Sequence, residues 1–174
     1  MSTIIGIVDN GRVWIGTDSY ATTTNGERRR IICKKSFVNS GYLISFIGSI
    51  RAGQSLRPEY FKAPKEIYQF PDKIIAQFEK CGCLGTDSDN QTYITESSFL
   101  IANSHGKLFE LLSDFQINEI EDYTSLGSGS SFALGSLYTT EAWKDPKKRI
   151  ITALKASGVY DMSTGPPYKI EKFL

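Results

Sequence analysis

The sequence predicts an α+β fold, a four-layer αββα sandwich in which two antiparallel sheets pack together and helices cover their outer faces. Apolar, strand-like runs come in neighbouring pairs joined by short turns, which favours antiparallel pairing. The order along the chain is strands, helices, strands, helices and a last strand, and neither sheet can leave both faces bare. With 174 residues the chain is too short for two ordinary domains. We therefore expect a single domain over residues 1–174.

The first part of the chain has the pattern of a β-hairpin followed by shorter strands. A β-branched run from Thr3 to Val8 is followed by the turn signal Asn10-Gly11, and Val13 to Thr17 resumes the strand pattern. A polar loop then leads to a short strand expected near Ile31 and Ile32. A further apolar strand is expected from Tyr42 to Ile47. These four early strands are joined locally, which favours antiparallel pairing.

Helical and strand patterns alternate over the rest of the chain. The predicted helices lie around Ser49 to Phe61, broken by Pro58, and from Pro71, and a loop follows from Cys81 to Gln91. The predicted strands are Ser98 to Asn103, Lys107 to Leu112, one that runs up to Leu126, and Tyr168 to Phe173. Two more helices precede that last strand. The first presents Phe132, Leu134, Leu137 and Tyr138 on one face, and the second is capped by Asp145, begins at Pro146 and presents Ile150, Ile151 and Leu154.

Composition and charge exclude several classes of function. Net charge is +1, from 20 basic and 19 acidic residues, which offers no general attraction to nucleic acid or to an anionic membrane. The run Arg28 to Arg30 is expected to be a solvated strand end. No segment approaches the roughly 20 apolar residues that a membrane span needs, and the N-terminus lacks the pattern of a signal peptide. We expect a cytoplasmic protein without nucleic-acid or membrane partners.

The cysteines and the histidine give no evidence for a metal or another cofactor. Cys33, Cys81 and Cys83 are an odd set without framework spacing, which indicates free thiols in a reducing compartment. A structural zinc needs four ligands, and Cys and His ligands alone would suffice only if the single histidine and all three cysteines came together. That histidine, His105, lies in a turn signal and is expected to be exposed. No cofactor is therefore expected.

The N-terminus combines two groups that hydrolysis needs. Ser2 is small enough for an aminopeptidase to expose it by removing Met1. Its hydroxyl could then attack a carbonyl while its own α-amine accepts the proton. An α-amine titrates near ~7.7–8, which suits a general base. Ser2 alone would still be an ordinary N-terminus, and Thr3 is a competing nucleophile if the chain is processed one residue further.

Other short signals lie at positions that strengthen this interpretation. Asp18 ends the second hairpin strand, a lysine pair precedes the next strand, Gly127-Ser128-Gly129-Ser130 lies between a strand and a helix, and Tyr160 to Gly165 follows the last helix. Together, in this order from residue 2, they resemble the proteasome β-subunit and HslV family of N-terminal-nucleophile (Ntn) hydrolases. The resemblance is strongest over residues 2–54 and 123–174.

The resemblance assigns roles by position. Ser2 matches the nucleophile, and Asp18 matches the acid that pairs with the site lysine. That lysine is Lys34 if no gap is introduced, or Lys35 if the polar loop carries one extra residue. The remaining matches are the residues expected near the amine: Ser128, Asp161 and Thr164. Ordinary alternatives are a helix cap for Ser128 and a turn for Asp161.

At two matched positions this sequence departs from the family, and four further positions match a substrate pocket. Ser45 stands where the family has a glycine whose backbone N–H forms the oxyanion hole, and Thr164 stands where the family usually has serine. The positions that line the first specificity pocket are Ala21, Ile32, Leu43 and Ile47. All four are apolar, which predicts an apolar residue before the scissile bond unless they are simply core residues.

The function that the resemblance implies is an endopeptidase for unfolded polypeptides. It would act in a homo-oligomeric ring or double ring fed by an ATP-dependent unfoldase. Two alternatives stay open: an Ntn amide hydrolase that acts on a small substrate, and a catalytically silent, ring-forming scaffold of the same fold. Retention of Met1 and the change to Ser45 would both favour the scaffold.

Overall fold

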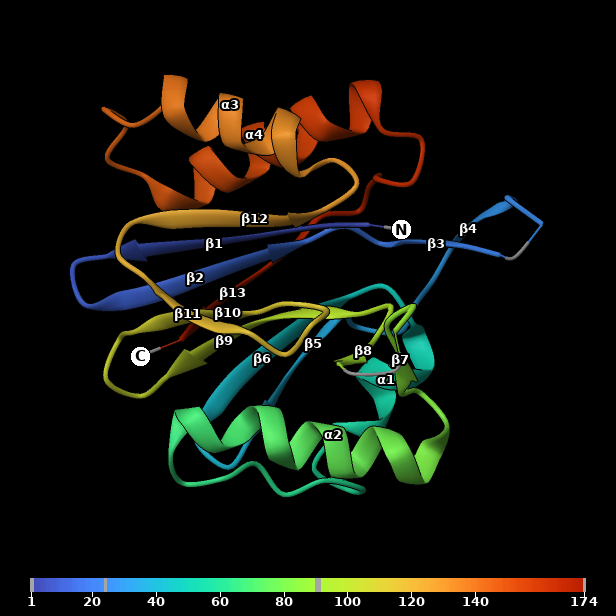
Figure 1. Cartoon of the computed structure of the whole chain (residues 1–174). Coiled ribbons are helices and arrows are strands. Elements are labelled where there is room, and N and C mark those ends of the chain that lie inside the picture. The colour runs from blue at the N-terminus through green and yellow to red at the C-terminus, as the bar shows by residue number, and fades with distance from the viewer. Residues whose placement is uncertain (1, 24, 90–91, 174) are drawn as a thin grey trace.

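The computed structural model describes residues 2–23, 25–89 and 92–173, and it confirms the predicted αββα architecture. Two antiparallel sheets pack face to face; helices α3 and α4 cover one outer face and α1 and α2 the other (Figure 1). Both hairpins expected near the N-terminus and in the middle of the chain are present. Met1 lies outside the described residues.

The first sheet has the strand order β12-β1-β2-β13, and neighbouring strands are antiparallel. Its strands are β1 (Thr3–Asp9), β2 (Arg12–Thr17), β12 (Tyr123–Gly127) and β13 (Lys169–Phe173). The N-terminal strand thus lies at the centre of this sheet. The start of β1, the end of β2, the end of β12 and the start of β13 all meet at one end of it.

The second sheet has the order β11-β10-β9-β6-β5 and is also antiparallel. Its strands are β5 (Ser36–Asn39), β6 (Tyr42–Ile47), β9 (Ser98–Asn103), β10 (Leu108–Leu111) and β11 (Ile117–Ile120). Strand β11 has no counterpart in the prediction. His105 lies exposed in the turn between β9 and β10, as predicted.

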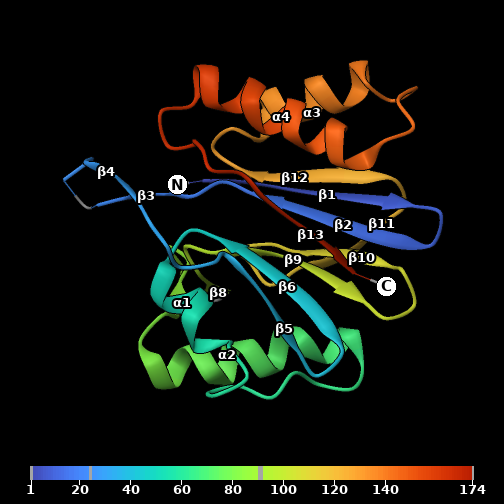
Figure 2. The same cartoon turned by 180° about the vertical axis from the view of Figure 1, so that it is seen from behind.

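Two short ribbons lie outside the sandwich. One consists of β7 (Gly85–Thr86) and β8 (Tyr93–Ile94), and the other of β3 (Tyr20–Thr22) and β4 (Arg28–Arg30). The β3–β4 ribbon projects beyond the sandwich near the N-terminus, as both cartoon views show (Figures 1 and 2). The strand expected near Ile31 and Ile32 is therefore wrong by a few residues. The pairing with β3 uses the arginines, which are exposed as predicted.

Helices α1 (Ile50–Ser55) and α2 (Phe70–Cys81) cover the second sheet, and a 3₁₀ turn at Ile67–Gln69 precedes α2. The Ser49 hydroxyl caps α1 by accepting a hydrogen bond from the Ala52 N–H at 3.3 Å. Helix α1 is shorter than predicted. The Asn39 side-chain amide bonds the carbonyls of Leu56 and Phe61, which holds the chain after α1 in a non-helical path.

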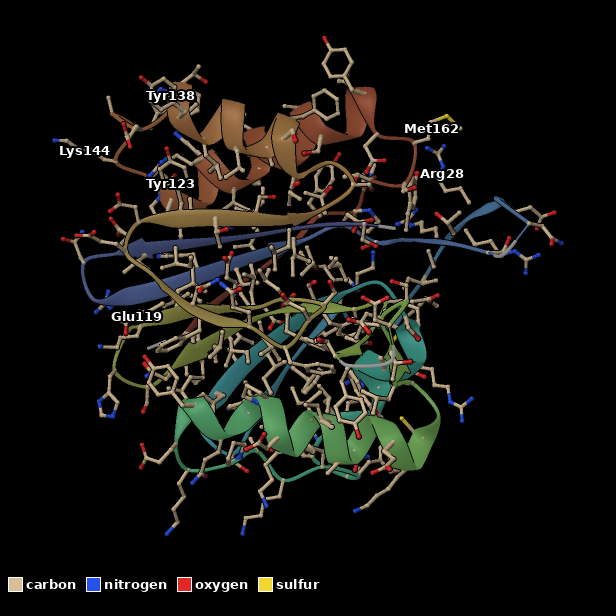
Figure 3. All side chains as sticks on the ribbon, viewed as in Figure 1. Arg28, Glu119, Tyr123, Tyr138, Lys144 and Met162 are labelled. Atoms are coloured by element: carbon tan, nitrogen blue, oxygen red, sulfur yellow. The ribbon has the colours of Figure 1, made fainter. Side chains whose placement is uncertain are left out.

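Helices α3 (Ser130–Thr139) and α4 (Pro146–Tyr160) cover the first sheet. The α4 prediction is confirmed at its start, because the Asp145 carboxylate accepts from two backbone N–H groups of the first turn. The face predicted for α3 is wrong. Leu137 is buried there together with Ala133, whereas Phe132, Leu134 and Tyr138 are exposed. Figure 3 shows Tyr138 on this outer layer.

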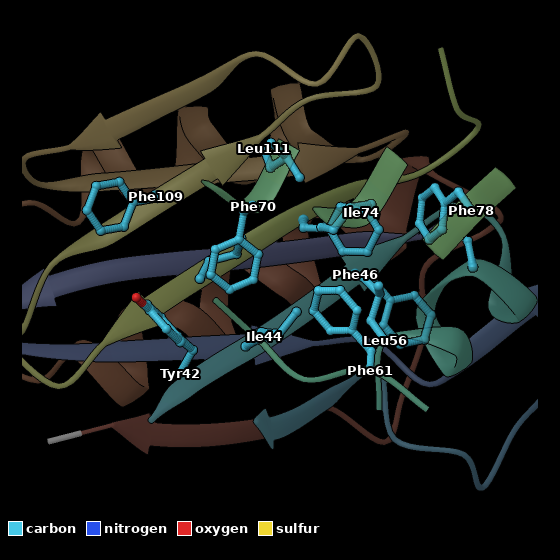
Figure 4. Close-up of a cluster of buried hydrophobic side chains, with 14 of the residues drawn as sticks. Tyr42, Ile44, Phe46, Leu56, Phe61, Phe70, Ile74, Phe78, Phe109 and Leu111 are labelled. Atoms are coloured by element: carbon cyan, nitrogen blue, oxygen red, sulfur yellow. The ribbon is translucent and has the colours of Figure 1, made fainter. Parts of the chain in front are cut away.

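Three apolar clusters hold the layers together. The cluster between the sheets consists of Ile4, Val13, Ile15, Leu43, Leu100, Ala102 and Leu108. A second, rich in phenylalanine, packs α1 and α2 onto the second sheet (Figure 4). In the third, Ile5 and Ile7 pack against α3 and α4. Alternate residues of β1 therefore face the space between the sheets and the layer of helices.

Candidate active site

Several of the predicted site residues meet at one end of the sandwich because of strand pairing. Thr3 pairs with Gly127 and Ile4 pairs with Thr17, so the residues just beyond these pairs converge. Ser2 precedes β1, Asp18 follows β2 and Ser128 follows β12. In an antiparallel sheet, the start of one strand lies beside the end of its neighbour. Segments far apart in sequence thus reach one place.

The first polar cluster consists of Ser2, Asp18 and Lys35 and lies between the two sheets. The Lys35 ammonium donates to Ser2 Oγ at 2.6 Å, to Asp18 Oδ1 at 2.7 Å and to the Tyr20 carbonyl at 2.5 Å. An ammonium has three protons, so each of the Lys35 protons has an acceptor. Lys35 is only 2% exposed, and the side chain of Asp18 is also buried. The lysine therefore connects the second sheet to the first through a buried ion pair.

Lys34 does not lie in this cluster, so the gap-free assignment of the site lysine is corrected to Lys35. The Lys34 side chain points outward, where its ammonium lies 3.6 Å from Glu171. Adjacent residues entering a strand face opposite sides, and the Phe46 N–H binds the Lys35 carbonyl just before β5 begins. This register turns Lys35 inward and Lys34 to solvent.

Burial perturbs both charges of the ion pair. Desolvation lowers the pKa of Lys35 below its ordinary value, and attraction to Asp18 opposes this shift. Desolvation also raises the pKa of Asp18, against the effect of Lys35 and of the hydrogen bonds from the Tyr20 and Thr3 N–H groups. The site therefore holds its charges at a desolvation cost, which their mutual contact and the hydrogen bonds around them offset in part.

The second polar cluster lies on the other face of β1 and contains the remaining three predicted residues. Asp161 Oδ2 accepts hydrogen bonds from the Ser128 hydroxyl at 2.8 Å and the Thr164 hydroxyl at 2.6 Å. Its other oxygen accepts from the Ser163 N–H at 3.1 Å. Asp161 thus caps a turn through the Ser163 N–H, and it also accepts hydrogen bonds from two hydroxyl groups. Ser128 is not the cap of α3, because Gly129 occupies that position.

Thr3 also belongs to this second cluster, a role that was not predicted from the sequence. Its hydroxyl lies 2.6 Å from the hydroxyl oxygen of Thr164 and is fully buried. Its backbone N–H donates to Asp18 Oδ1 at 3.3 Å. The alternation along β1 was the available signal, because it sends Thr3 to the side of Ile5. A fully buried hydroxyl bonded in this way is poorly placed to attack a substrate.

Two glycines allow these segments to approach each other. Gly127 has a φ of +112°, and a Cβ there would lie 1.8 Å from the Ser2 carbonyl oxygen. At Gly129 a Cβ would lie 2.4 Å from Thr3 Oγ1 and 3.2 Å from Asp161 Oδ2. The Ser128 N–H also binds the Ser2 carbonyl at 3.1 Å. The predicted Gly-Ser-Gly segment therefore closes on the N-terminal strand.

The residue matched to the oxyanion hole lies elsewhere. Ser45 is in the interior of β6, opposite Ser36 on β5 and Leu100 on β9. A backbone N–H in such a strand lies in the plane of the sheet and points at a neighbouring strand. Ser45 is also completely buried, and its hydroxyl donates to the Lys35 carbonyl at 3.1 Å. We therefore assign no oxyanion role to Ser45.

The four residues predicted to line a specificity pocket separate in the structure. Leu43 is a core residue between the sheets, so its assignment to an open pocket is wrong. Ile32 is 95% exposed, while Ala21 and Ile47 are half-buried. A cavity of about 440 Å³ does occur near the end of β6, but none of the four lines it. Its walls are formed by Ser49, Arg51, Gly82, Cys83, Leu84, Gly85, Ile94, Thr95 and Glu96.

Metal binding and membrane insertion find no structural basis in the described residues. Over residues 2–23, 25–89 and 92–173, no three His, Cys, Asp or Glu side chains are grouped so that they could hold a metal ion. Within the same residues, no helix is long and apolar enough to cross a bilayer. Cys33, Cys81 and Cys83 are free thiols, as predicted.

Known structures with the same fold include proteins of the predicted type. The chain aligns with the BPH of Thiobacillus denitrificans in complex with epoxomicin at a TM-score of 0.84 and 18% identity, over 98% of this chain and 97% of that one. A eukaryotic HslV from Trypanosoma brucei aligns at a TM-score of 0.71 and 15% sequence identity, over 98% of each chain. The Anbu complex from Pseudomonas aeruginosa, a helical assembly, aligns at a TM-score of 0.73 and 10% sequence identity, over 98% of this chain and 80% of that one.

These similarities establish the fold. No protein-family model and no curated protein sequence matches the chain. The fold of the chain is nevertheless that of HslV and Anbu, so the likeness expected from the sequence is confirmed at this level. At such low identity, the chemistry has to be argued from the residues of this chain.

Proposed function

We propose that this protein is an N-terminal-nucleophile hydrolase that cleaves peptide bonds with Ser2 as the nucleophile. The observation that carries the proposal is the contact of 2.6 Å between Lys35 Nζ and Ser2 Oγ, backed by the buried ion pair with Asp18. A lysine held at this distance by a buried carboxylate is an arrangement that activates or orients a hydroxyl.

The proposed mechanism begins with the removal of Met1, which frees the α-amine of Ser2. The ammonium of Lys35 donates its three protons to Ser2, Asp18 and the Tyr20 carbonyl. In this charged form the lysine has no lone pair and cannot act as a base. The α-amine is then the nearest base on the same residue. The Lys35 cation lowers the pKa of that amine by repulsion, which favours its neutral form.

Bond making and breaking follow from these assignments. Ser2 Oγ attacks the scissile carbonyl carbon and its proton passes to the α-amine. The tetrahedral intermediate collapses, the C–N bond breaks, and the departing amine takes that proton. An ester on Ser2 remains. A water molecule attacks this ester with the α-amine again as base, which releases the acid product and restores the hydroxyl.

The proposed substrate is an unfolded polypeptide with an apolar side chain before the scissile bond. Ala21 and Ile47, half-buried and apolar, remain candidates for the pocket, and Ile32 is exposed enough to contact a substrate. Burial of a Leu-sized group contributes roughly 1.5–3 kcal/mol. Fluorogenic peptides ending in Leu, Tyr or Phe should therefore be cut about 10- to 100-fold faster than those ending in Asp or Lys. Preference for a charged residue would remove these positions from the pocket.

We further propose a homo-oligomeric ring or double ring, fed by an ATP-dependent unfoldase in the cytoplasm. Support for self-assembly comes from the similarity to the Anbu complex. The free thiols support a reducing compartment. Size measurement by light scattering and co-purification with an ATPase test these two points.

The decisive experiment combines intact mass with activity. The purified chain should lack Met1, hydrolyse an apolar fluorogenic peptide, and gain the mass of one epoxomicin on Ser2. Ser2→Ala should lose about 10³-fold or more of kcat and all epoxomicin labelling, while the chain remains folded. Retention of Met1 on every copy would instead favour the silent scaffold. Loss of activity in Thr3→Ala with full activity in Ser2→Ala would move the nucleophile to Thr3.

A further inference from the structure

Thr3 is bonded to both polar clusters of the site. Its backbone N–H donates to Asp18 Oδ1, on the side of the Lys35 ion pair, at 3.3 Å. Its hydroxyl lies 2.6 Å from Thr164 Oγ1, on the side of Asp161. Both contacts are buried, and Thr3 is the residue that directly follows Ser2. A displacement of Thr3 would therefore move the nucleophile relative to both clusters.

The direction of the hydroxyl bonds follows from counting protons. Thr164 has one hydroxyl proton and donates it to Asp161 Oδ2 at 2.6 Å. The Thr164 oxygen must then accept from Thr3, so Thr3 is the donor of their shared bond. Ser128 donates to the same carboxylate oxygen at 2.8 Å. The result is a chain of donors that runs from Thr3 through Thr164 to Asp161, where Ser128 joins it.

The surrounding backbone leaves little freedom to this chain of bonds. Gly129 passes so close that an added Cβ would lie 2.4 Å from Thr3 Oγ1. The Ser128 N–H binds the carbonyl of Ser2, one bond before Thr3 begins. The peptide unit between Ser2 and Thr3 is thus held by the segment that also carries Ser128. Buried hydroxyl networks of this kind hold one geometry when every member is satisfied.

We infer that Thr3 is a positioning residue of the proposed hydrolase, whose hydroxyl fixes the Thr164–Asp161–Ser128 network against the strand that carries Ser2. This inference rests on the proposed function and extends it. Thr3 itself touches neither the substrate nor the attacking oxygen. It acts through Thr164 and through the backbone of Ser2, so its loss should misplace the nucleophile without changing the substrate's binding surface.

Three variants test the inference. Thr3→Val keeps the shape but removes the donor, and it should lower kcat about 10- to 100-fold, as small misplacements of reacting groups do, with KM within about twofold. Thr3→Ser keeps the hydroxyl and should restore kcat to within about threefold of wild type. Thr124→Val is the matched control, because it removes another buried threonine hydroxyl of the same sheet, bonded to Glu110 away from the site. It should leave kcat unchanged.

The outcomes separate a positioning role from a merely structural one. A kcat for Thr3→Val equal to wild type overturns the inference, and so does equal loss in Thr3→Ser and Thr3→Val. If Thr3→Val fails to fold, Thr164→Val breaks the same chain of hydrogen bonds one bond later. A lower kcat at constant KM in Thr164→Val would then support the inference, and an unchanged kcat would overturn it. If both single variants fold, their double variant should lose no more than the worse of the two.

Failure of the inference is distinguishable from failure of the proposed function. A wild-type chain without Ser2-dependent hydrolysis overturns the proposed function and this inference with it. A wild-type chain that hydrolyses peptides through Ser2, while Thr3→Val matches it in kcat, overturns the inference alone.

Discussion

Ser2 and Thr3 are neighbours in the chain, yet their side chains enter two different environments. Ser2 turns toward the space between the sheets, where Lys35 and Asp18 form a buried ion pair. Thr3 turns toward the helical layer, where hydroxyl groups converge on Asp161. The two clusters are connected through Thr3, whose N–H binds Asp18 and whose hydroxyl binds Thr164, but they consist of different kinds of group. Each therefore depends on a different physical property of the site.

The ion-pair cluster depends on charge balance, and the hydroxyl cluster depends on close fit. Lys35 and Asp18 are stable together because each offsets the desolvation of the other. In the hydroxyl cluster, Gly129 leaves space for Thr3 and the half-buried Asp161. Removal of a charge should destabilise the ion-pair cluster most, while an added methyl group should destabilise the hydroxyl cluster most.

The largest expected effect is the loss of one partner of the ion pair. Lys35→Met leaves the Asp18 carboxylate buried without its counter-ion, and we expect about 3–5 kcal/mol lower free energy of unfolding together with loss of peptide hydrolysis. Urea denaturation followed by fluorescence measures the first effect. Lys34→Met is the matched control. Lys34 is exposed and its partner Glu171 is only half-buried, so loss of this ion pair should cost at most about 1 kcal/mol.

Removal of both charges tests whether balance is the cause. The double variant Lys35→Met/Asp18→Asn should recover at least about half of the stability that Lys35→Met loses, because no uncompensated buried charge remains. It should stay inactive. A double variant no more stable than Lys35→Met would show that the lysine contributes by packing instead of by charge.

A smaller effect is expected from crowding the hydroxyl cluster. Gly129→Ala places a methyl group 2.4 Å from Thr3 Oγ1, and we expect about 1–3 kcal/mol of destabilisation and a reduced kcat. Gly135→Ala is the control, since it lies inside α3, the helix that Gly129 caps, and no atom outside the helix backbone lies within 4 Å of the added group. It should stabilise the chain by about 0.5–1 kcal/mol. Wild-type activity in Gly129→Ala would mean that the fit around Thr3 tolerates adjustment.

The smallest expected effect is the dependence of stability on pH. Because burial raises the pKa of Asp18 above 3.8, the native state binds more protons than the unfolded state just above that pH, and stability falls as pH rises through this window. Because burial lowers the pKa of Lys35 below 10.5, the unfolded state binds more protons just below that pH, and stability rises toward it. The free energy of unfolding, measured by denaturation at a series of pH values for the wild type and for Lys35→Met/Asp18→Asn, should differ between the two proteins with both of these slopes. A flat difference would contradict them.

Local patterns predicted most elements of the fold but not how each one packs. The turn at Asn10-Gly11 and the cap at Asp145 are local features, and both are present. The exposed side of α3 was misjudged because its helix carries apolar residues on more than one face. Which face is buried depended on Ala133 and Leu137, whose small and medium side chains fit against the sheet.

The sequence by itself determined that a strand begins directly after Ser2, that Asp18 ends the paired strand, and that a Gly-Ser-Gly turn precedes a helix. These are local consequences of alternation, turn chemistry and chain order. Only the tertiary structure decided between Lys34 and Lys35, because adjacent residues face opposite sides and the pairing of β5 with β6 selects the one that turns inward. It also decided that the Thr3 hydroxyl binds Thr164 and that Leu43 is core, since both depend on which layer covers each face of a strand.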